Sequence, residues 1–563
     1  MNTYIIFINT DSTELLVLSF GLRFMKEMGS YDYIIVGGGA AGCVLANRLS
    51  ENPKNTVLLL EAGKDEKWIW TKIPVGYLYC INNPRTDWCY KTEAEAGLNG
   101  RSIIYARGKG LGGSTLINAM LYLRGQARDY DEWAELSKDD IWSWENCFPV
   151  FKEVEDSWRG NNENHSSGGE WRVEQQRLSW EILDHYAAAA EQAGIPVSSD
   201  FNEGNNFGVS KFDVNQKRGT RWSSARGFID PIRKRPNLTI MAGVLSDKLV
   251  LENKQVKGVE FIQGVEQSVV TANKEVILSA GAIGSPAILQ RSGIGDPSAL
   301  NQLNIPVKHE LTGVGKNLQD HLQLRTVFKV EGVKTLNQTA NSLWGKAMMG
   351  LEYAINRSGP LTMAPSQLGL FAYSDDSVAT PDLEFHIQPL SLDKFGDPLH
   401  SFPAVTASVL DLRPQSRGTV TIADNNPRSA PKIAPNYLSH EADRIKSVKA
   451  LRLTRDILKQ SALAPYKPEE FLPGIEYQTD EELMHAAGDV GTTIFHPVGT
   501  CKMGEKNDQT AVTDSRLRVR GLSGLRVIDA SVMPTITSGN TSSPTIMLAT
   551  RGAKMILEDQ FDG

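Results

Sequence analysis

The chain has 563 residues, of which 41% are hydrophobic and 22% are charged, a composition typical of globular proteins and not of fibrous or disordered ones. Its formal net charge is −7 and it has no long basic block, which argues against nucleic acid and against an anionic membrane surface as partners. Five scattered cysteines form no C-x-x-C pair, which indicates reduced thiols in a cytoplasm-like compartment and argues against a zinc site.

Residues 1–29 are predicted to form an N-terminal extension. They hold two short apolar patches, but the uncharged start and the acids between the patches are unlike a signal peptide, so no export is expected. Translation from Met25 or Met28 stays an open alternative. No apolar run approaches the ~20 residues that a membrane helix needs, so no transmembrane segment is predicted. The nine histidines show no H-E-x-x-H or similar spacing, and we predict no metal site.

The stretch Tyr31–Gly63 is predicted to fold as strand, turn, helix and strand. The first strand is Tyr33–Val36, and the second, Val57–Leu60, ends at Glu61. A G-x-G-x-x-G motif follows the first strand, where a pyrophosphate can approach the backbone at the positive end of a helix; its glycines are Gly37, Gly39 and Gly42. A carboxylate at Glu61 can accept the ribose hydroxyls of an adenosine. The stretch predicts a dinucleotide site, with a structural glycine turn as the alternative.

A second glycine cluster, Arg107–Thr115, runs into the apolar segment Leu116–Arg124. A glycine pair before a helix start again offers backbone N–H groups to an anion. Two such clusters suit a ligand with two phosphates, and a flexible hinge is the alternative interpretation.

The middle of the chain alternates between helix and strand patterns. Trp180–Ala193 is predicted to be an amphipathic helix, and Asn237–Leu251 and Gly258–Ile262 are predicted to be strands. Glu275–Ser279 has the apolar centre of a buried strand and leads into a helix that starts near Gly281.

Residues 330–490 have a different character, with several strand-like runs, proline-containing turns and no glycine–phosphate signature. The runs are Leu383–Gln388, Ala404–Leu410 and Gly418–Ile422. They predict a second domain built on an antiparallel sheet with flanking helices. From about residue 488 the sequence again resembles the first part of the chain, with a predicted strand at Leu525–Asp529 and a predicted helix at Asn540–Ile556.

Several separate stretches share the pattern of one enzyme family. They are Gly37–Gly42 with Glu61–Gly63, Gly108–Asp131, Gly281–Gly295, Gly313–His321, Phe495–Gly504 and Asp529–Thr545. Together they resemble the glucose–methanol–choline (GMC) oxidoreductases, which bind FAD, and the resemblance spans Tyr31 to the end of the chain. It implies an α/β fold with a Rossmann-like FAD-binding domain and an inserted α+β substrate domain on an antiparallel sheet. The implied FAD-binding segments are 30–165, 222–322 and 488–563, and the substrate-binding segments are 166–221 and 323–487.

The resemblance implies oxidation of an alcohol, with hydride transfer to the flavin and proton transfer to a base. By this likeness the base is His496 and its partner is Asn540, which would hydrogen-bond the substrate oxygen. Some relatives have a second histidine at the Asn540 position, and this chain does not. His321, in the NLQDH stretch, is expected to be structural.

FAD contacts are carried over from the family position by position. The implied cofactor-binding residues are Gly37, Gly39, Ala40, Ala41, Gly42, Glu61, Ala62, Arg107, Gly112, Gly113, Asn118, Ala119, Ser246, Asp529, Ala530 and Thr541. Some relatives attach FAD through a histidine just before the second glycine cluster. Ser102–Arg107 reads SIIYAR without a histidine, so noncovalent FAD is predicted.

The substrate is expected to be a neutral primary alcohol, aliphatic or aromatic, which is oxidised to an aldehyde. Phe495 is expected to line the pocket, together with His386. Choline-oxidising members carry a glutamate in the stretch that resembles Leu361–Ala372, which here contains no acid. A cationic substrate is therefore disfavoured, because a buried charge needs a partner.

Other predictions stay open. The electron acceptor is O2 or a quinone-type carrier, so the enzyme is an alcohol oxidase or a choline dehydrogenase-like alcohol dehydrogenase. The predicted location is cytoplasmic, or peripheral to a membrane if the acceptor is a quinone, and the oligomeric state is undetermined. A flavin-dependent lyase of the same family, either a fatty acid photodecarboxylase or a hydroxynitrile lyase, is the alternative function. The photodecarboxylases lack the His496 and Asn540 pair.

Overall fold

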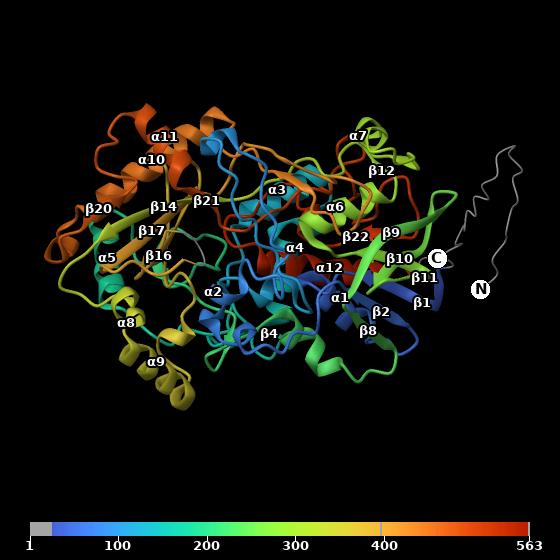
Figure 1. Ribbon diagram of the computed structural model, residues 1–563, viewed down its shortest axis with the longest axis horizontal. Coiled ribbons are helices and arrows are strands. Elements are labelled where there is room, and N and C mark those ends of the chain that lie inside the picture. The colour runs from blue at the N-terminus through green and yellow to red at the C-terminus, as the bar shows by residue number, and fades with distance from the viewer. Residues whose placement is uncertain (1–24, 394–396, 561–563) are drawn as a thin grey trace, which may run out of the picture.

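A computed structural model describes residues 25–393 and 397–560, and two seven-stranded sheets organise it (Figure 1). Residues 1–24, which make up most of the predicted N-terminal extension, lie outside the described residues. No helix in the described part of the chain is long and apolar enough to cross a membrane.

The first sheet is parallel at one side and antiparallel at the other. Its strand order is β8 (Leu238–Ala242), β2 (Val57–Glu61), β1 (Lys26–Val36), β11 (Glu266–Leu278), β10 (Gln255–Gln263) and β9 (Val244–Glu252), with β22 (Leu525–Val527) also paired to β11. The strands β8, β2, β1, β11 and β22 run parallel, whereas β9, β10 and β11 form an antiparallel meander. The parallel strands therefore end at a common edge, which is where α/β sheets bind ligands.

Strand β1 begins at Lys26 and not at the predicted Tyr33. Its first half pairs with the first half of β11, for example Lys26 with Ser268 and Tyr31 with Ala272. These early residues are largely exposed, so no buried apolar run marks them in the sequence. Residues 26–29 of the predicted extension thus belong to the first sheet.

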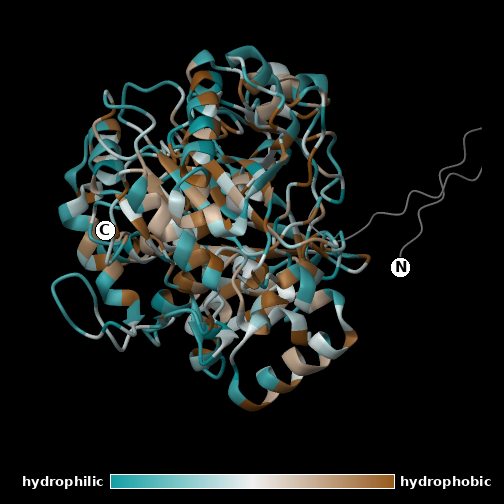
Figure 2. Ribbon diagram, turned by 90° about the vertical axis from the view of Figure 1, so that its left-hand side faces the viewer, coloured by the Kyte–Doolittle hydropathy of each residue, from teal (hydrophilic) through white to brown (hydrophobic). Residues whose placement is uncertain are grey.

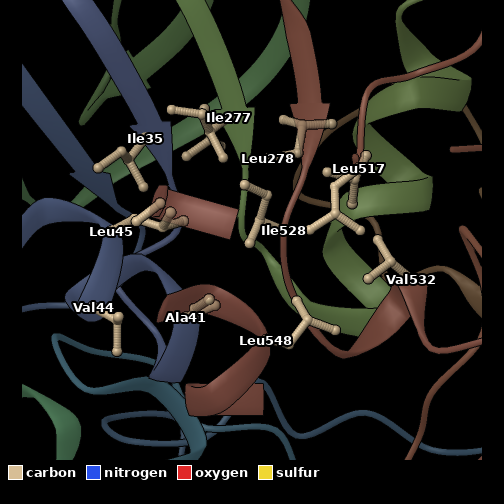
Figure 3. Packing of buried hydrophobic residues seen from close by; sticks show 14 of the residues in the cluster. Ile35, Ala41, Val44, Leu45, Ile277, Leu278, Leu517, Ile528, Val532 and Leu548 are labelled. Atoms are coloured by element: carbon tan, nitrogen blue, oxygen red, sulfur yellow. The ribbon is translucent and has the colours of Figure 1, made fainter. Parts of the chain in front are cut away.

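Helices α1 (Ala40–Leu49) and α12 (Ser542–Asp559) pack together beside the first sheet. Figure 3 shows Leu45 of α1 beside Ile35 of β1, and Leu548 of α12 on the side of Ile528 and Val532, all in one apolar cluster. This core fixes the first turns of both helices at the carboxyl edge of the sheet. The helix predicted from Gly281 is α6 (Gly281–Arg291), which follows β11 directly.

The second sheet is antiparallel. Its order is β20 (Glu469–Leu472), β14 (Leu322–Lys329), β17 (Ala404–Asp411), β16 (Leu383–Gln388), β15 (Leu368–Ala372) and β5 (Gly208–Lys211), with β21 (Gly491–Thr493) also paired to β14. The antiparallel sheet was predicted, and β16 has the predicted bounds. The predicted strand at Gly418–Ile422 instead pairs, as β18 (Thr419–Thr421), with β19 (Lys432–Ala434) in a separate two-stranded sheet.

The second sheet is buried on both faces, and the two faces differ in polarity. On β16, Leu383, Phe385 and Ile387 join an apolar cluster that includes helices α5 (Glu181–Gln192), α10 (Glu441–Leu458) and α11 (Asp480–Val490). The alternate residues Glu384, His386 and Gln388 are also buried, and they face the other way because strand side chains alternate. A buried polar face needs an explanation, and a cavity beside it supplies one.

The domain boundaries stay a prediction. Strand β21 lies beyond residue 488, inside the last predicted FAD-binding segment, yet it pairs with β14 of the second sheet. The chain leaves β21 directly into the segment that carries His496, so this segment starts from the second sheet and ends against the first.

The other helices and strands connect these layers. They are α2 (Tyr77–Cys80), α3 (Ala127–Ser137), α4 (Trp144–Val154), α7 (Pro297–Gln302), α8 (Leu336–Asn341), α9 (Leu343–Asn356), β3 (Glu155–Ser157), β4 (Trp171–Val173), β6 (Gln216–Lys217), β7 (Thr220–Arg221), β12 (Ile294–Gly295) and β13 (His309–Glu310).

Candidate active site

One cavity runs from the carboxyl edge of the first sheet to the polar face of the second. At one end it is lined by the strand ends at Val36, Glu61 and Ser279, and at the other by His386 and Gln388 of β16. His496 and Asn540 also line it. The cavity therefore joins the two glycine clusters to the predicted catalytic pair.

The first glycine turn meets the sheet closely. Gly37 has a φ of 106°, and a Cβ placed there would lie 2.4 Å from the Ser279 carbonyl oxygen. At Gly42 a Cβ would lie 1.8 Å from the Gly37 carbonyl oxygen, so this glycine lets helix and strand pack together. Helix α1 has no side-chain cap and no acid in its first turn, which leaves its N–H groups and positive dipole end for an anion.

The second glycine cluster packs directly on the first. Gly112 N–H donates to the Gly38 carbonyl at 2.7 Å. Gly113 has a φ of 52°, and a Cβ placed on it would lie only 2.6 Å from the Gly39 Cα. The predicted helix start is wrong here, because the cluster enters only a 3₁₀ turn, Gly113–Leu116. Buried Arg221 donates to the carbonyls of Thr115 and Asn118, which replaces the bonds that a helix would make.

Glu61 ties the two glycine clusters together. Its carboxylate accepts backbone N–H groups from Gly38 at 2.8 Å, Gly63 at 2.6 Å and Gly110 at 3.1 Å. Burial raises the pKa of Glu61 to about 7, against the lowering effect of these three donors. Glu61 also lines the cavity, so one side chain organises the walls of the predicted dinucleotide site.

At the other end of the cavity a hydrogen-bonded chain of four groups contains His496. Asn540 Nδ2 lies 2.9 Å from His496 Nε2, and His496 Nδ1 lies 3.0 Å from His321 Nδ1. His321 Nε2 lies 3.1 Å from the Leu412 carbonyl oxygen. Both imidazoles are buried.

The end groups of this chain assign the tautomers. A carbonyl only accepts, so His321 carries its proton on Nε2, and in the neutral ring its Nδ1 must accept. His496 then donates from Nδ1, which leaves Nε2 with a lone pair that the Asn540 amide meets as a donor. Burial lowers the pKa of His321 from 6.5 to about 4 and lowers the pKa of His496 well below 6.5, so both rings are neutral at pH 7.

The backbone around His496 is held in a strained form. Phe495 has a φ of 69°, a left-handed conformation that is costly for an aromatic residue. Buried Asp320 accepts the His496 backbone N–H at 2.7 Å and the Thr493 hydroxyl at 2.6 Å, and Arg107 donates to the Phe495 carbonyl at 2.5 Å. These bonds fix the direction in which the His496 ring points.

The polar face of β16 supplies the wall beyond His496. His386 Nδ1 lies 2.9 Å from Ser366 Oγ, and its Nε2 lies 2.9 Å from Glu384 Oε1. The second oxygen of Glu384 is buried and has no partner among the described residues. Glu384 lies outside Leu361–Ala372, where the sequence analysis looked for an acid.

Most of the predicted site residues meet at the cavity. The lining residues among them are Gly37, Gly39, Ala40, Ala41, Glu61, Ala62, Arg107, Gly113, Asn118, Ala119, Ser246, His386, Phe495, His496, Asp529, Ala530, Asn540 and Thr541. Gly42 and Gly112 do not line it, and they shape the turns instead. His321, which was expected to be structural, is in direct contact with His496; its place in the family-like GVGKNLQDH stretch was the available signal.

The cavity fits FAD by its own chemistry. Besides the uncapped helix α1, helix α12 starts at the cavity without a side-chain cap or an acid in its first turn. The hydroxyls of Ser542 and Ser543 and the Asn540 Oδ1 atom are buried there without partners among the described residues. Free N–H groups and hydroxyl donors at two helix N-termini suit the phosphates of a ligand, and an unpartnered amide oxygen suits a donor of its polar ring.

Comparison with known proteins agrees with this chemistry. Family models described as GMC oxidoreductase match residues 31–323 and 414–549. Oxygen-dependent choline dehydrogenase of Klebsiella pneumoniae subsp. pneumoniae is 40% identical over 93% of this chain and 96% of its own. The protein of the same name from Escherichia coli K12 is 39% identical over 93% and 95%.

Solved structures are similar along nearly the whole chain. Pyridoxine 4-oxidase from Mesorbium loti is 30% identical, with a TM-score of 0.85 over 93% of this chain and 99% of that one. A formate oxidase from Aspergillus oryzae RIB40, studied for FAD modification, is 26% identical, with a TM-score of 0.87 over 95% and 100%.

Replacing Glu61 by Ala is expected to weaken FAD retention by at least ~10-fold, because three buried N–H groups lose their acceptor. The ratio of flavin to protein absorbance after gel filtration measures it. Glu66→Ala is the matched control, since Glu66 pairs with Arg85 and does not line the cavity. Unchanged flavin content in Glu61→Ala would remove Glu61 from cofactor binding.

Replacing His321 by Leu is expected to slow flavin reduction on the order of 10–100-fold, the effect of losing a partner that orients a metal-bound imidazole, because His321 orients His496 in the same way. His321→Gln should restore most of the rate, because an amide can donate to Leu412 and accept from His496. Equal rates in both variants would contradict the assigned tautomers.

The same pair carries a pH signature. The folded pKa of His321, about 4, lies below its ordinary value of 6.5, so the unfolded chain binds the proton more readily. As the pH is lowered from 6.5 to 4, this group should therefore lower the free energy of unfolding by about 1.4 kcal/mol per pH unit. The slope should be smaller in His321→Gln, as measured by urea unfolding.

Proposed function

Because the chain belongs to the GMC oxidoreductases, FAD-dependent enzymes that act on CH–OH groups, we propose that it oxidises a neutral primary alcohol to the aldehyde with His496 as the base. The observation that carries this proposal is the position of His496 at the cavity, in contact with His321 and Asn540. The tautomer assigned from these contacts leaves a lone pair on Nε2.

Each group of the site has one task in this reaction. Bound FAD supplies the hydride acceptor. Asn540 Nδ2, which donates to His496 Nε2 in the absence of substrate, turns its N–H to the substrate oxygen. His496 Nε2 takes the hydroxyl proton as the carbinol carbon is oxidised.

The proton on His496 is then held by the buried chain behind it. The imidazolium keeps its Nδ1–H bond to His321, whose Nε2–H donates to the Leu412 carbonyl. No carboxylate bonds the His496 ring among the described residues. Burial is the main cause of its low pKa, and the positive charge of Arg107 lowers the pKa further. The low pKa keeps the resting ring neutral at pH 7, so its Nε2 lone pair is available to take the hydroxyl proton.

The preference for a neutral substrate is supported by the lining of the cavity. The acids among the described lining residues are Glu61 and Asp529, and both are engaged by backbone N–H groups near the glycine turns. Around His496 and Asn540 the lining includes Phe495, Ile494 and Gln323. Such a wall accepts an apolar group and one or two hydrogen bonds.

Choline is the second candidate. It is favoured by the relatives named choline dehydrogenase and by the unpartnered oxygen of Glu384, which lies behind His386. For choline to bind, this carboxylate would have to offset the charge of the ammonium group.

Anaerobic mixing with benzyl alcohol, 1-hexanol and choline tests the proposal through the visible absorbance of the flavin. Bleaching is expected with the neutral alcohols, and His496→Ala should slow it on the order of 10²–10⁴-fold while FAD stays bound, the usual worth of a general base. Faster bleaching by choline would select the second candidate. No bleaching by any alcohol would favour a flavin-dependent lyase. Air or a quinone, added afterwards, identifies the acceptor.

We also propose that FAD is held noncovalently. The histidines among the described cavity-lining residues are His386 and His496, and the segment before the second glycine cluster has none. Acid precipitation of the protein is expected to leave yellow FAD in the supernatant. Flavin that stays in the pellet would contradict this.

A further inference from the structure

Helix α9 (Leu343–Asn356) presents an unusually apolar surface to solvent. Leu343, Trp344, Met348, Leu351 and Ile355 have exposed fractions of 86%, 75%, 44%, 53% and 69%. The helix is well defined, since Ser342 caps its N-terminus through the Gly345 N–H. Its exposed apolar residues thus belong to a regular helix surface.

These residues form one continuous stripe. At about 100° per residue, the exposed positions 343, 344, 347, 348, 351, 354 and 355 fall within an arc of about 140°. The buried residues Met349 and Tyr353 lie on the opposite side of the helix. A helix that is apolar on two opposite faces needs a second apolar neighbour, and packing of Met349 and Tyr353 against the protein supplies only one.

The stripe lies at the edge of the molecule. Figure 1 shows α8 and α9 projecting beyond the second sheet. In Figure 2 the helix at the lower edge shows brown, hydrophobic segments with pale and teal segments between them. Val265 and Ile475 are also strongly exposed apolar residues, and each lies in a turn outside α9.

Five exposed cations lie on α9 or on segments that contact its C-terminal end. Lys346 is on α9, and Arg357 caps its C-terminal end. Two other segments reach the same end through hydrogen bonds. Arg177 Nε donates to the Arg357 carbonyl, and the Tyr353 hydroxyl donates to the Gly219 carbonyl. Those segments contribute Arg177, Lys217 and Arg218. None of the five pairs with a carboxylate within the described residues, and α9 itself contains a single acid, Glu352.

We propose that α9 is a docking element for an anionic membrane surface. The stripe would enter the boundary between headgroups and acyl chains, where Trp and Leu are favoured, and the five cations would meet the lipid phosphates. A second copy of the chain fits less well, because each copy would bring the same five cations and, on α9, only Glu352 as an acid. The negative net charge does not oppose docking, since screening limits charge interactions to about 10 Å.

The position of α9 links docking to the cavity. Only eight residues separate the end of α9 from Pro365, which lines the cavity together with Ser366. Docking would hold this connecting segment against the lipid, where an apolar alcohol or a lipid-soluble electron acceptor would be concentrated. This consequence rests on the proposed function, whereas docking itself does not.

Co-sedimentation of the holoenzyme with vesicles tests the proposal. Binding is expected with phosphatidylcholine mixed with phosphatidylglycerol, and little with phosphatidylcholine alone. The double variant Trp344→Ser, Leu351→Ser should bind at least ~10-fold more weakly. Arg218→Ala with Lys346→Ala should bind roughly 20–30-fold more weakly, from about 5-fold per charge. Both variants should keep their FAD and their rate of flavin reduction, which shows that they are folded.

The matched control is Val265→Ser with Ile475→Ser, which removes two exposed apolar residues away from α9 and should leave vesicle binding unchanged. Wild-type protein that binds neither kind of vesicle would overturn the proposal, and so would equal binding by the α9 variant. A stripe variant that turns a dimer into a monomer, with unchanged vesicle binding, would identify a second copy as the occupant. Vesicle binding without alcohol oxidation would refute only the proposed function.

Discussion

The arrangement of the site depends on the hydrogen-bonded chain that runs from the Leu412 carbonyl through His321 and His496 to Asn540. Leu412 directly follows β17, and His321 directly precedes β14. His496 follows β21, and Asn540 precedes α12. This hydrogen-bonded chain forms only when the second sheet packs against helix α12, which lies beside the first sheet. Because a carbonyl accepts and cannot donate, the direction of every proton in the chain follows from one backbone oxygen. Burial keeps both rings neutral, so geometry and charge state support the same assignment.

The cofactor end of the cavity depends on close backbone approach and not on side chains. The two glycine clusters touch at Gly39 and Gly113, and Glu61 collects N–H groups from both. A buried carboxylate is costly alone, and three donors offset that cost. This arrangement leaves the N–H groups of α1 pointing at the cavity. At the His496 end of the cavity, Phe495 has a strained backbone conformation. Asp320 and Arg107 hold this conformation in place through hydrogen bonds to the neighbouring backbone.

The surface around α9 shows why average charge is a weak guide to partners. The chain carries a net charge of −7, yet five cations from separate segments gather around an apolar stripe. Electrostatic attraction to a surface acts over about one Debye length, so local arrangement decides it. Pro365 and Ser366 of the cavity wall follow the end of α9 after eight residues, which connects this surface to the site along the chain.

The sequence determined much of this protein by itself. Glycine spacing after an apolar strand, and the acid that ends the next strand, located the dinucleotide end, because those features depend on local backbone geometry. The family-like stretches placed His496 and Asn540, and period-two apolar runs located β16. Tertiary structure decided what depends on distant partners. Strand β1 extends to Lys26 because β11 lies beside it, and Leu116–Arg124 is not helical because Arg221, about a hundred residues away, takes its carbonyls. His321 acts on His496 across 175 residues, and the cations of α9 come together from separated segments. No local pattern records such contacts, because they arise only when the sheets pack.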